Sequence, residues 1–226
     1  CDVDPETHTL DADKIEELIT PRTCAIMPVH VWGRACDVDH IQDIAKANHL
    51  KVLYDAAHAF GCSYQGQMIA GFGDAEVFSF HATKFFNTLE GGAITTNNAG
   101  LARKLRMMRD FGYDENSDVV MQGTNGKMSE ASAAMGLVNL EALDGIIARN
   151  LQNYHQYQAE LANVPGLKPA RFDETEERNY QYVVAEIDEA ITGINRDQLV
   201  KILHAERVLA RRYFQPGCHQ MEPYRR

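Results

Sequence analysis

The chain has 226 residues, of which 45% are hydrophobic and 24% charged, and its formal net charge is -10. These proportions are those of a globular protein with room for one domain, or for one domain and part of a second. The acidic balance argues against a nucleic-acid partner or a membrane surface, since both require a basic face. No apolar run reaches the length of a transmembrane helix. The five cysteines are an odd number without metal-like spacing, which favours reduced thiols and a cytoplasmic location.

The first half of the chain alternates helical and strand-like patterns. Asp11 is the predicted N-cap of a helix over residues 12–19, and apolar spacing predicts a further helix over 38–48. A third helix is predicted over 99–109. Four apolar runs predict strands over residues 23–30, 51–55, 75–80 and 92–96. Helices and strands in alternation predict the α/β class, with a mostly parallel sheet covered by helices.

The second half begins with a long helical pattern. Ser129 is the predicted N-cap of a helix over residues 130–162, which is expected to bend or to be interrupted at Gly145 or a neighbour. The pattern beyond it predicts a strand over 180–187, a helix over 196–206 and a last strand over 208–214. We therefore expect a large domain over residues 1–145. Residues 146–226 then hold the connecting helix and part of a small α+β domain. Neither end of the chain has the character of a domain boundary, so we expect a fragment.

Polar side chains follow two of the predicted strands. Asp55 closes the apolar run KVLYD and is followed by His58, while Ser79 lies at the end of the run AEVFSF and Lys84 follows five residues later. The carboxyl ends of neighbouring strands are the usual ligand site in an open α/β sheet. A carboxylate, a hydroxyl and a lysine are therefore expected to converge on one crevice.

Each of these residues also has an ordinary structural interpretation. A lysine after a strand is most often a solvated surface charge, and a strand-end aspartate often caps a turn or a helix. Together, however, they are the groups that pyridoxal 5'-phosphate (PLP) needs. These are a lysine to condense with its aldehyde, a carboxylate to keep its pyridine nitrogen protonated and a hydroxyl to hold its phosphate.

Two segments, DAAHAFG at residues 55–61 and GDAEVFSFHATKFFNTLEGGAITT at 73–96, closely resemble the DegT/DnrJ/EryC1/StrS family. The family comprises PLP-dependent nucleotide-sugar aminotransferases of fold type I. The resemblance extends upstream to DVDPETHTLD and downstream to GTNGKMSEASAAMGLVNLEAL and LARRYFQPGCHQMEPY, and so covers nearly the whole chain.

The resemblance implies a role for individual residues. Lys84 resembles the lysine that forms the Schiff base and acts as catalytic acid and base, and Asp55 resembles the partner of the pyridine nitrogen. His58 stands where the family places a residue near the ring hydroxyl, and Ser79 resembles a phosphate ligand. Asn125, with Lys127 as its alternative, matches a segment that reaches into the neighbouring subunit's site.

The resemblance also implies an activity. Because lysine rather than histidine stands at position 84, it implies transamination rather than sugar dehydration. The expected reaction transfers an amino group from glutamate to a nucleotide-linked 4-keto-6-deoxy sugar, in a homodimer that takes part in deoxyamino-sugar biosynthesis. The family's upstream segment, which supplies a phosphate-binding turn, precedes the part that the chain matches. The alternative is therefore a PLP-binding regulator or a catalytically incomplete fragment of the same fold.

Other functions are less favoured by the sequence. A nucleotide-binding dehydrogenase is disfavoured because the glycine fingerprint of such enzymes is missing. The nine histidines are scattered without the spacing of a metal site, so we predict no metal.

Overall fold

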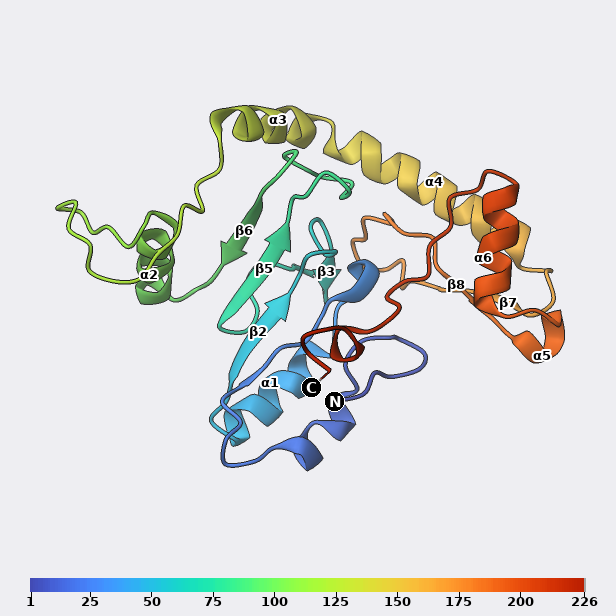
Figure 1. Ribbon diagram of the computed structural model, residues 1–226, viewed down its shortest axis with the longest axis horizontal. Coiled ribbons are helices and arrows are strands. Elements are labelled where there is room, and N and C mark those ends of the chain that lie inside the picture. The colour runs from blue at the N-terminus through green and yellow to red at the C-terminus, as the bar shows by residue number, and fades with distance from the viewer. Residues whose placement is uncertain (226) are drawn as a thin grey trace. The chain divides into compact units, whose positions relative to one another are not determined.

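The computed structural model describes residues 1–225 (Figure 1). The chain divides into two compact units. The first comprises Cys1–Tyr154 and Phe172–Tyr182, and the second comprises His155–Arg171 and Val183–Arg226. The first unit holds the strand ends at which the site is predicted. The boundary expected between the large domain, residues 1–145, and the rest of the chain, residues 146–226, stays a prediction.

A four-stranded sheet with the order β1-β2-β5-β6 is the centre of the first unit. Strands β1 and β2 pair in parallel, as do β2 and β5, while β6 runs antiparallel to β5. The predicted class, α/β with a mostly parallel sheet, is confirmed. The strand bounds are β1 Ala25–Ile26, β2 Lys51–Asp55, β5 Ala75–Ser79 and β6 Gly92–Thr95.

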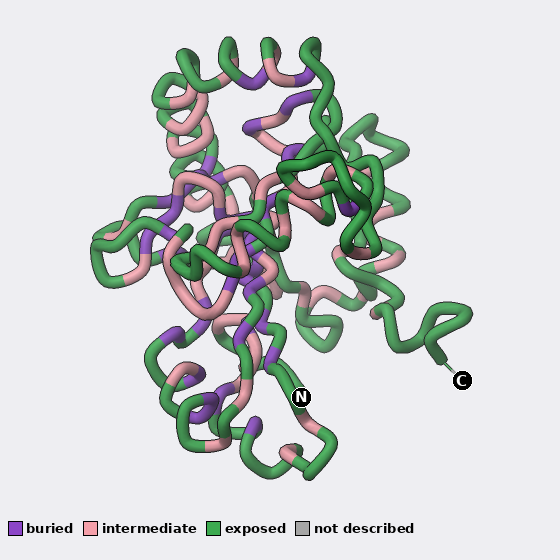
Figure 2. Tube along the Cα trace, turned by 90° about the vertical axis from the view of Figure 1, so that its left-hand side faces the viewer, coloured by how far each residue is buried: buried purple, intermediate pink, exposed green. Residues whose placement is uncertain are grey.

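One face of this sheet is the hydrophobic core. Side chains alternate between the faces of a strand, so Val52 and Tyr54 are buried while their neighbours in β2 are more exposed. The helix α1, Val38–Ala47, packs Ile41 and Ile44 into the same cluster. Figure 2 shows the buried residues as short stretches of the trace, between longer stretches that are exposed or intermediate. The core therefore lies between the sheet and α1 and holds the two together.

The opposite face of the sheet is more open. Leu53, Val77 and Ile94 lie on adjacent strands and are 37%, 37% and 48% exposed, respectively. A groove of about 1020 Å³ is lined by residues of β5, β6 and the helix α2, Ala99–Arg109. Because parallel sheets are normally covered on both faces, this face has the composition of a surface that another segment or chain covers.

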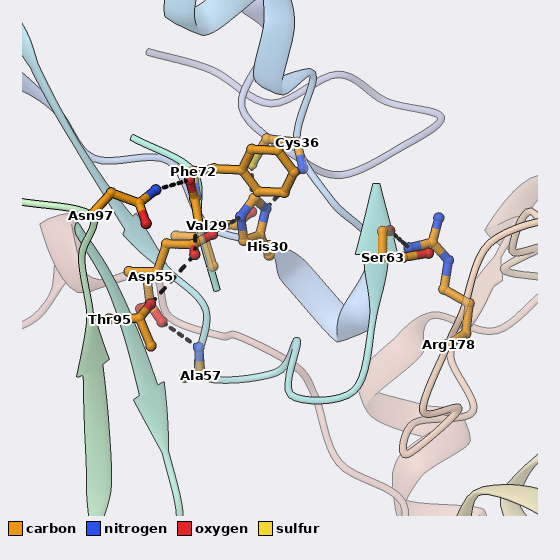
Figure 3. A network of polar contacts seen from close by, with 12 residues as sticks. Val29, His30, Cys36, Asp55, Ala57, Ser63, Phe72, Thr95, Asn97 and Arg178 are labelled. Carbon is orange, nitrogen blue, oxygen red and sulfur yellow. Dashed lines mark hydrogen bonds and ion pairs between the residues drawn. The ribbon is translucent and has the colours of Figure 1, made fainter. Parts of the chain in front are cut away.

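A short hairpin and the segment 172–182 complete the surroundings of the site. Strands β3, Ser63–Tyr64, and β4, Gln67–Met68, pair antiparallel. The buried Arg178 donates to the backbone oxygens of Gly33 and Ser63, at 3.3 and 2.9 Å (Figure 3). These bonds attach the returning segment to the loops that follow β1 and β2.

Several predicted helices are confirmed, with changes at their ends. α1 lies where apolar spacing places it, α2 covers the predicted residues, and Ser129 caps α3 by accepting from the Ser132 backbone N–H. The long helix is interrupted at Ala142, three residues before Gly145, giving α3, Glu130–Glu141, and α4, Leu143–Leu161. Within residues 1–225 no single helix is long and apolar enough to span a membrane; the α3–α4 pair, bent by 63°, meets the criteria of length and composition only jointly.

Other predicted elements are shorter or wrong. Asp11 caps a 3-10 turn, Ala12–Lys14, rather than a helix reaching residue 19, and a second such turn covers Glu16–Leu18. The strand expected over 23–30 is reduced to β1, because Pro28 cannot donate to a ladder. Among the described residues, 208–214 contain no strand, and the segment turns at once through a bond from the Ala210 N–H to the Val208 oxygen.

The second unit is small. It contains a strand pair, a single helical turn, the helix α6 and a last 3-10 turn, and none of its described residues is buried. α6 carries a capping box in which Asn195 and Gln198 bond each other's backbone. The strand predicted over 180–187 is confined to β8. The bounds are β7 Leu167–Pro169, β8 Ala185–Ile187, α5 Glu189–Thr192, α6 Arg196–Ala205 and the 3-10 turn Cys218–Gln220.

Candidate active site

The site begins at the carboxyl ends of β2 and β5. Asp55 is in register with Val77, so the last residue of β2 lies beside the residue two positions before Ser79, where β5 ends. The Asp55 backbone is fixed by the segment that follows β1, since its N–H donates to the Pro28 oxygen and its oxygen accepts from the His30 N–H, both at 2.9 Å. Its carboxylate accepts from the Ala57 N–H at 2.9 Å (Figure 3). The carboxylate is therefore held at the edge of the sheet.

Lys84 lies on the turn that follows β5. Its N–H donates to the His81 oxygen at 2.9 Å, and its oxygen accepts from the Asn87 side chain at 3.1 Å. The side chain is half-buried, and this burial lowers the pKa of the Lys84 amine, while the negative charge of Asp55 opposes the shift. A lysine with a lowered pKa has more of its amine unprotonated near neutral pH and is a better nucleophile.

His58 is the buried member of the site and is 5% exposed. Its Nδ1 accepts from the Trp32 backbone N–H at 3.2 Å. Burial lowers the pKa of His58 to about 4, and the Lys84 cation acts in the same direction, whereas Asp55 acts against it. His58 is therefore neutral at physiological pH.

Ser79 is half-buried at the end of β5. Its Oγ accepts from the His81 N–H at 3.4 Å. The His81 ring and Thr83 hydroxyl are hydrogen-bonded at 2.9 Å, so hydroxyls and backbone N–H groups gather on this turn. Such a turn has the donors that a phosphate group needs.

Asn125 lies in a different part of the first unit. It forms a bridge with Asp110 on the exposed loop after α2. Its alternative, Lys127, pairs with Asp110 at 2.6 Å and lies 4.3 Å from the centre of the Phe111 ring. The structure thus places Asp55, Ser79, His58 and Lys84 around one edge of the sheet, and Asn125 on a projecting loop.

The comparisons with known proteins agree with this geometry. The DegT/DnrJ/EryC1/StrS aminotransferase family matches residues 1–226. The chain belongs to this family. It is 39% identical over 225 residues to dTDP-4-amino-4,6-dideoxy-D-glucose transaminase of Shigella dysenteriae, covering 99% of the chain and 60% of that enzyme. It is 40% identical over 227 residues to GDP-perosamine synthase of Caulobacter vibrioides, with the same coverage.

Solved structures of the family have the same fold. A crystal structure of DesI in the presence of its TDP-sugar product has a TM-score of 0.94 and 48% identity, covering all of this chain and 57% of DesI. PseC of Helicobacter pylori has a TM-score of 0.91 and 27% identity, covering 99% of this chain and 61% of PseC. The chain thus spans about 60% of the length of the curated relatives it matches.

PLP is the cofactor of this family, and the residues at the strand ends fit it. The half-buried Lys84 amine has a lowered pKa and lies within the electrostatic influence of Asp55. A carboxylate, a neutral imidazole and a hydroxyl turn complete the set of groups that the cofactor requires. Lys84 would hold the aldehyde end, Asp55 the pyridine nitrogen and Ser79 the phosphate.

Some residues of the site escaped the sequence prediction. The His58 backbone oxygen accepts from Asn179 at 2.8 Å and from Gln181 at 2.9 Å, and the Tyr182 ring lies 4.8 Å from the His58 ring. Gln181 and Tyr182 belong to the stretch over 180–187 expected to be a strand, and Asn179 directly precedes it. The dense alternation of amide and aromatic side chains in NYQY was the only signal of their role, and it does not reveal a partner more than 100 residues away.

Proposed function

We propose that the chain is the cofactor-binding part of a PLP-dependent nucleotide-sugar aminotransferase. The proposed reaction transfers an amino group from glutamate to a nucleotide-linked 4-keto-6-deoxy sugar. One observation carries the proposal: the Asp55 carboxylate, at the end of β2 beside β5, lies close enough to the Lys84 amine and the His58 imidazole for its negative charge to raise the pKa of both, against the effect of burial. The activities of the relatives support the choice of a nucleotide sugar as substrate.

Each residue has a defined part in this proposal. Lys84 provides the amine that holds the cofactor covalently, and after its release the same amine moves a proton at the carbon that bears the nitrogen. Asp55 keeps the pyridine nitrogen protonated. When bound, PLP supplies the electron sink that stabilises negative charge at that carbon. Ser79 and the backbone N–H of the turn after it bind the phosphate and orient the ring.

Further parts of the proposal concern the whole protein. Residues 1–145 belong to the PLP-binding large domain, and residues 146–226 to the connecting helix and the small domain. The protein acts as a homodimer in which Asn125, on its exposed loop, reaches the site of the neighbouring subunit. It is located in the cytoplasm, and the five unbridged cysteines of the described chain are compatible with that reducing compartment.

Reduction with borohydride tests the role of Lys84. The purified chain is incubated with PLP, reduced and digested, and the modified peptide is identified by mass spectrometry. We expect one adduct, on Lys84. The matched control is Lys104→Ala, which removes an exposed lysine of α2 and leaves the adduct in place. An adduct that persists in Lys84→Ala, or that lies on another lysine, would overturn the assignment.

A second assay separates the enzyme from a PLP-binding regulator. The protein with bound PLP is mixed with glutamate and a nucleotide-linked 4-keto-6-deoxy sugar, and the release of 2-oxoglutarate is measured. Release of more than one equivalent of 2-oxoglutarate per chain, dependent on the keto sugar, supports the aminotransferase. An adduct on Lys84 without any release of 2-oxoglutarate supports the regulator or an incomplete fragment instead.

A further inference from the structure

The Trp32 backbone N–H determines which nitrogen of His58 can carry a proton. This N–H donates to Nδ1 of His58 at 3.2 Å, in a buried environment. A backbone amide is always a donor, so Nδ1 must present its lone pair as the acceptor. In a neutral imidazole the single proton then lies on Nε2.

The turn that presents this N–H is tightly constrained. Trp32 has φ 56° and ψ 20°, a left-handed conformation that non-glycine residues seldom adopt, and Gly33 follows with φ 86°. A Cβ on Gly33 would lie 3.1 Å from the Cys62 sulfur and 3.3 Å from the His58 oxygen. The turn therefore packs directly against the loop that carries His58, and a side chain at position 33 would both strain the backbone and push its neighbours apart.

The loop that carries His58 is fixed from the other side as well. Its backbone oxygen accepts two side-chain hydrogen bonds, from Asn179 at 2.8 Å and from Gln181 at 2.9 Å. The Tyr182 ring lies 4.8 Å from the imidazole, tilted by 58°. Rotation of the imidazole by half a turn would leave the ring plane against Tyr182 but would bring Cδ2, which cannot accept a hydrogen bond, into the place of Nδ1, and so would cost the bond to Trp32.

We propose that the Trp32 amide fixes His58 as the neutral tautomer with its proton on Nε2, so that His58 is a fixed hydrogen-bond donor beside Lys84 and not a proton carrier. Trp32 is thus a positioning residue that acts through His58. The charged groups that influence the ring are Lys84, which repels an imidazolium, and Asp55, which favours one. The identity of the acceptor rests on the proposed function: the Nε2–H of His58 donates to an oxygen of the cofactor.

NMR reads the tautomer directly. The complete 226-residue chain, labelled with ¹⁵N-histidine and without cofactor, is studied at pH 7 by long-range ¹H–¹⁵N correlation. His58→Gln identifies the His58 signals by their loss. We expect Nδ1 of His58 without a proton and Nε2 with one. His30 is an internal reference, since its Nδ1 accepts from the Cys36 N–H at 3.0 Å and should show the same tautomer. A proton on Nδ1 of His58, or an imidazolium, overturns the proposal.

Two variants separate the amide from the indole. Trp32→Asn keeps the N–H and tolerates a left-handed backbone, so we expect the tautomer to be unchanged. A changed tautomer in this variant means that the indole and not the amide sets it, which overturns the proposal. Gly33→Ala disturbs the turn itself, and we expect a mixture of tautomers or ring orientations.

Cofactor affinity tests the donor role. His58→Gln retains an N–H donor and His58→Phe does not, although both fill the space. Loss of one hydrogen bond is worth roughly tenfold in affinity, so the Phe variant should bind PLP about ten times more weakly than the Gln variant. Equal affinities would contradict the donor role. If the protein binds no PLP, the proposed function is refuted. The tautomer of His58 is measured without PLP, so the NMR result still decides whether Trp32 fixes it.

Discussion

Acidification should destabilise the first unit through His58. The pKa of His58 is about 4 in the folded chain against an ordinary value of 6.5. Between these values the unfolded chain binds a proton that the folded chain does not, so stability falls as the pH decreases from 6.5 towards 4. At about 1.36 kcal/mol for each pH unit, the loss between pH 7 and pH 4 is about 3 kcal/mol. Burial contributes most to this loss, and the Lys84 cation adds to it.

Urea unfolding at a series of pH values measures this effect. The fluorescence of Trp32, the single tryptophan of the chain and a direct neighbour of His58, reports on the first unit. The free energy of unfolding is compared between the wild type and His58→Gln, which cannot titrate in this range. We expect the wild type to lose about 3 kcal/mol more than the variant between pH 7 and pH 4. Parallel pH profiles for the two proteins would refute the reasoning.

Three further predictions concern the surroundings of the site. Gly73→Ala places a Cβ 2.8 Å from a strand carbonyl oxygen at φ 59°, and should cost more than about 2 kcal/mol. Gly66→Ala, at φ 75° with open space around it, is the control and should cost only about 1–2 kcal/mol in thermal or urea unfolding. Ser63→Ala removes the hydroxyl that accepts a backbone N–H at 2.8 Å, so we expect a loss of about 1–2 kcal/mol in the same assay; no change would show that water replaces the bond. Asp55→Asn removes the charge that opposes the lowering of the Lys84 pKa, so PLP trapping by borohydride should extend to lower pH, unless the variant no longer binds PLP.

The sequence predicts what depends on neighbours along the chain. α2 covers the predicted residues 99–109, and its first turn is fixed locally, because Asn98 accepts from the Leu101 N–H. β2 is identified by the apolar run over residues 51–55. The position of Asp55 and Ser79 at one edge then follows from parallel pairing alone. Fold class and the strand-end site are therefore accessible without coordinates.

What the sequence does not predict depends on contacts between distant segments. Tyr180 lies in an apolar, β-prone stretch, yet its ring packs against Tyr154 and Phe172 and its backbone has φ 48°. No strand can continue through such a residue, and only the fold shows which rings it meets. Residues 208–214 have the composition of a strand, but in the described chain no neighbouring strand supplies a ladder. Strand propensity is realised only where another strand lies alongside.

The electrostatics of the site follow from this division between local and distant contacts. Lys84 and Asp55 carry the charges and are placed by adjacent elements of the sheet, whereas His58 is kept neutral by burial and by the turn at Trp32. An imidazolium at position 58 would compete with Lys84 for the single carboxylate of Asp55. A neutral, fixed donor avoids this competition, so the Asp55 carboxylate stays available for the pyridine nitrogen that the proposed chemistry assigns to it.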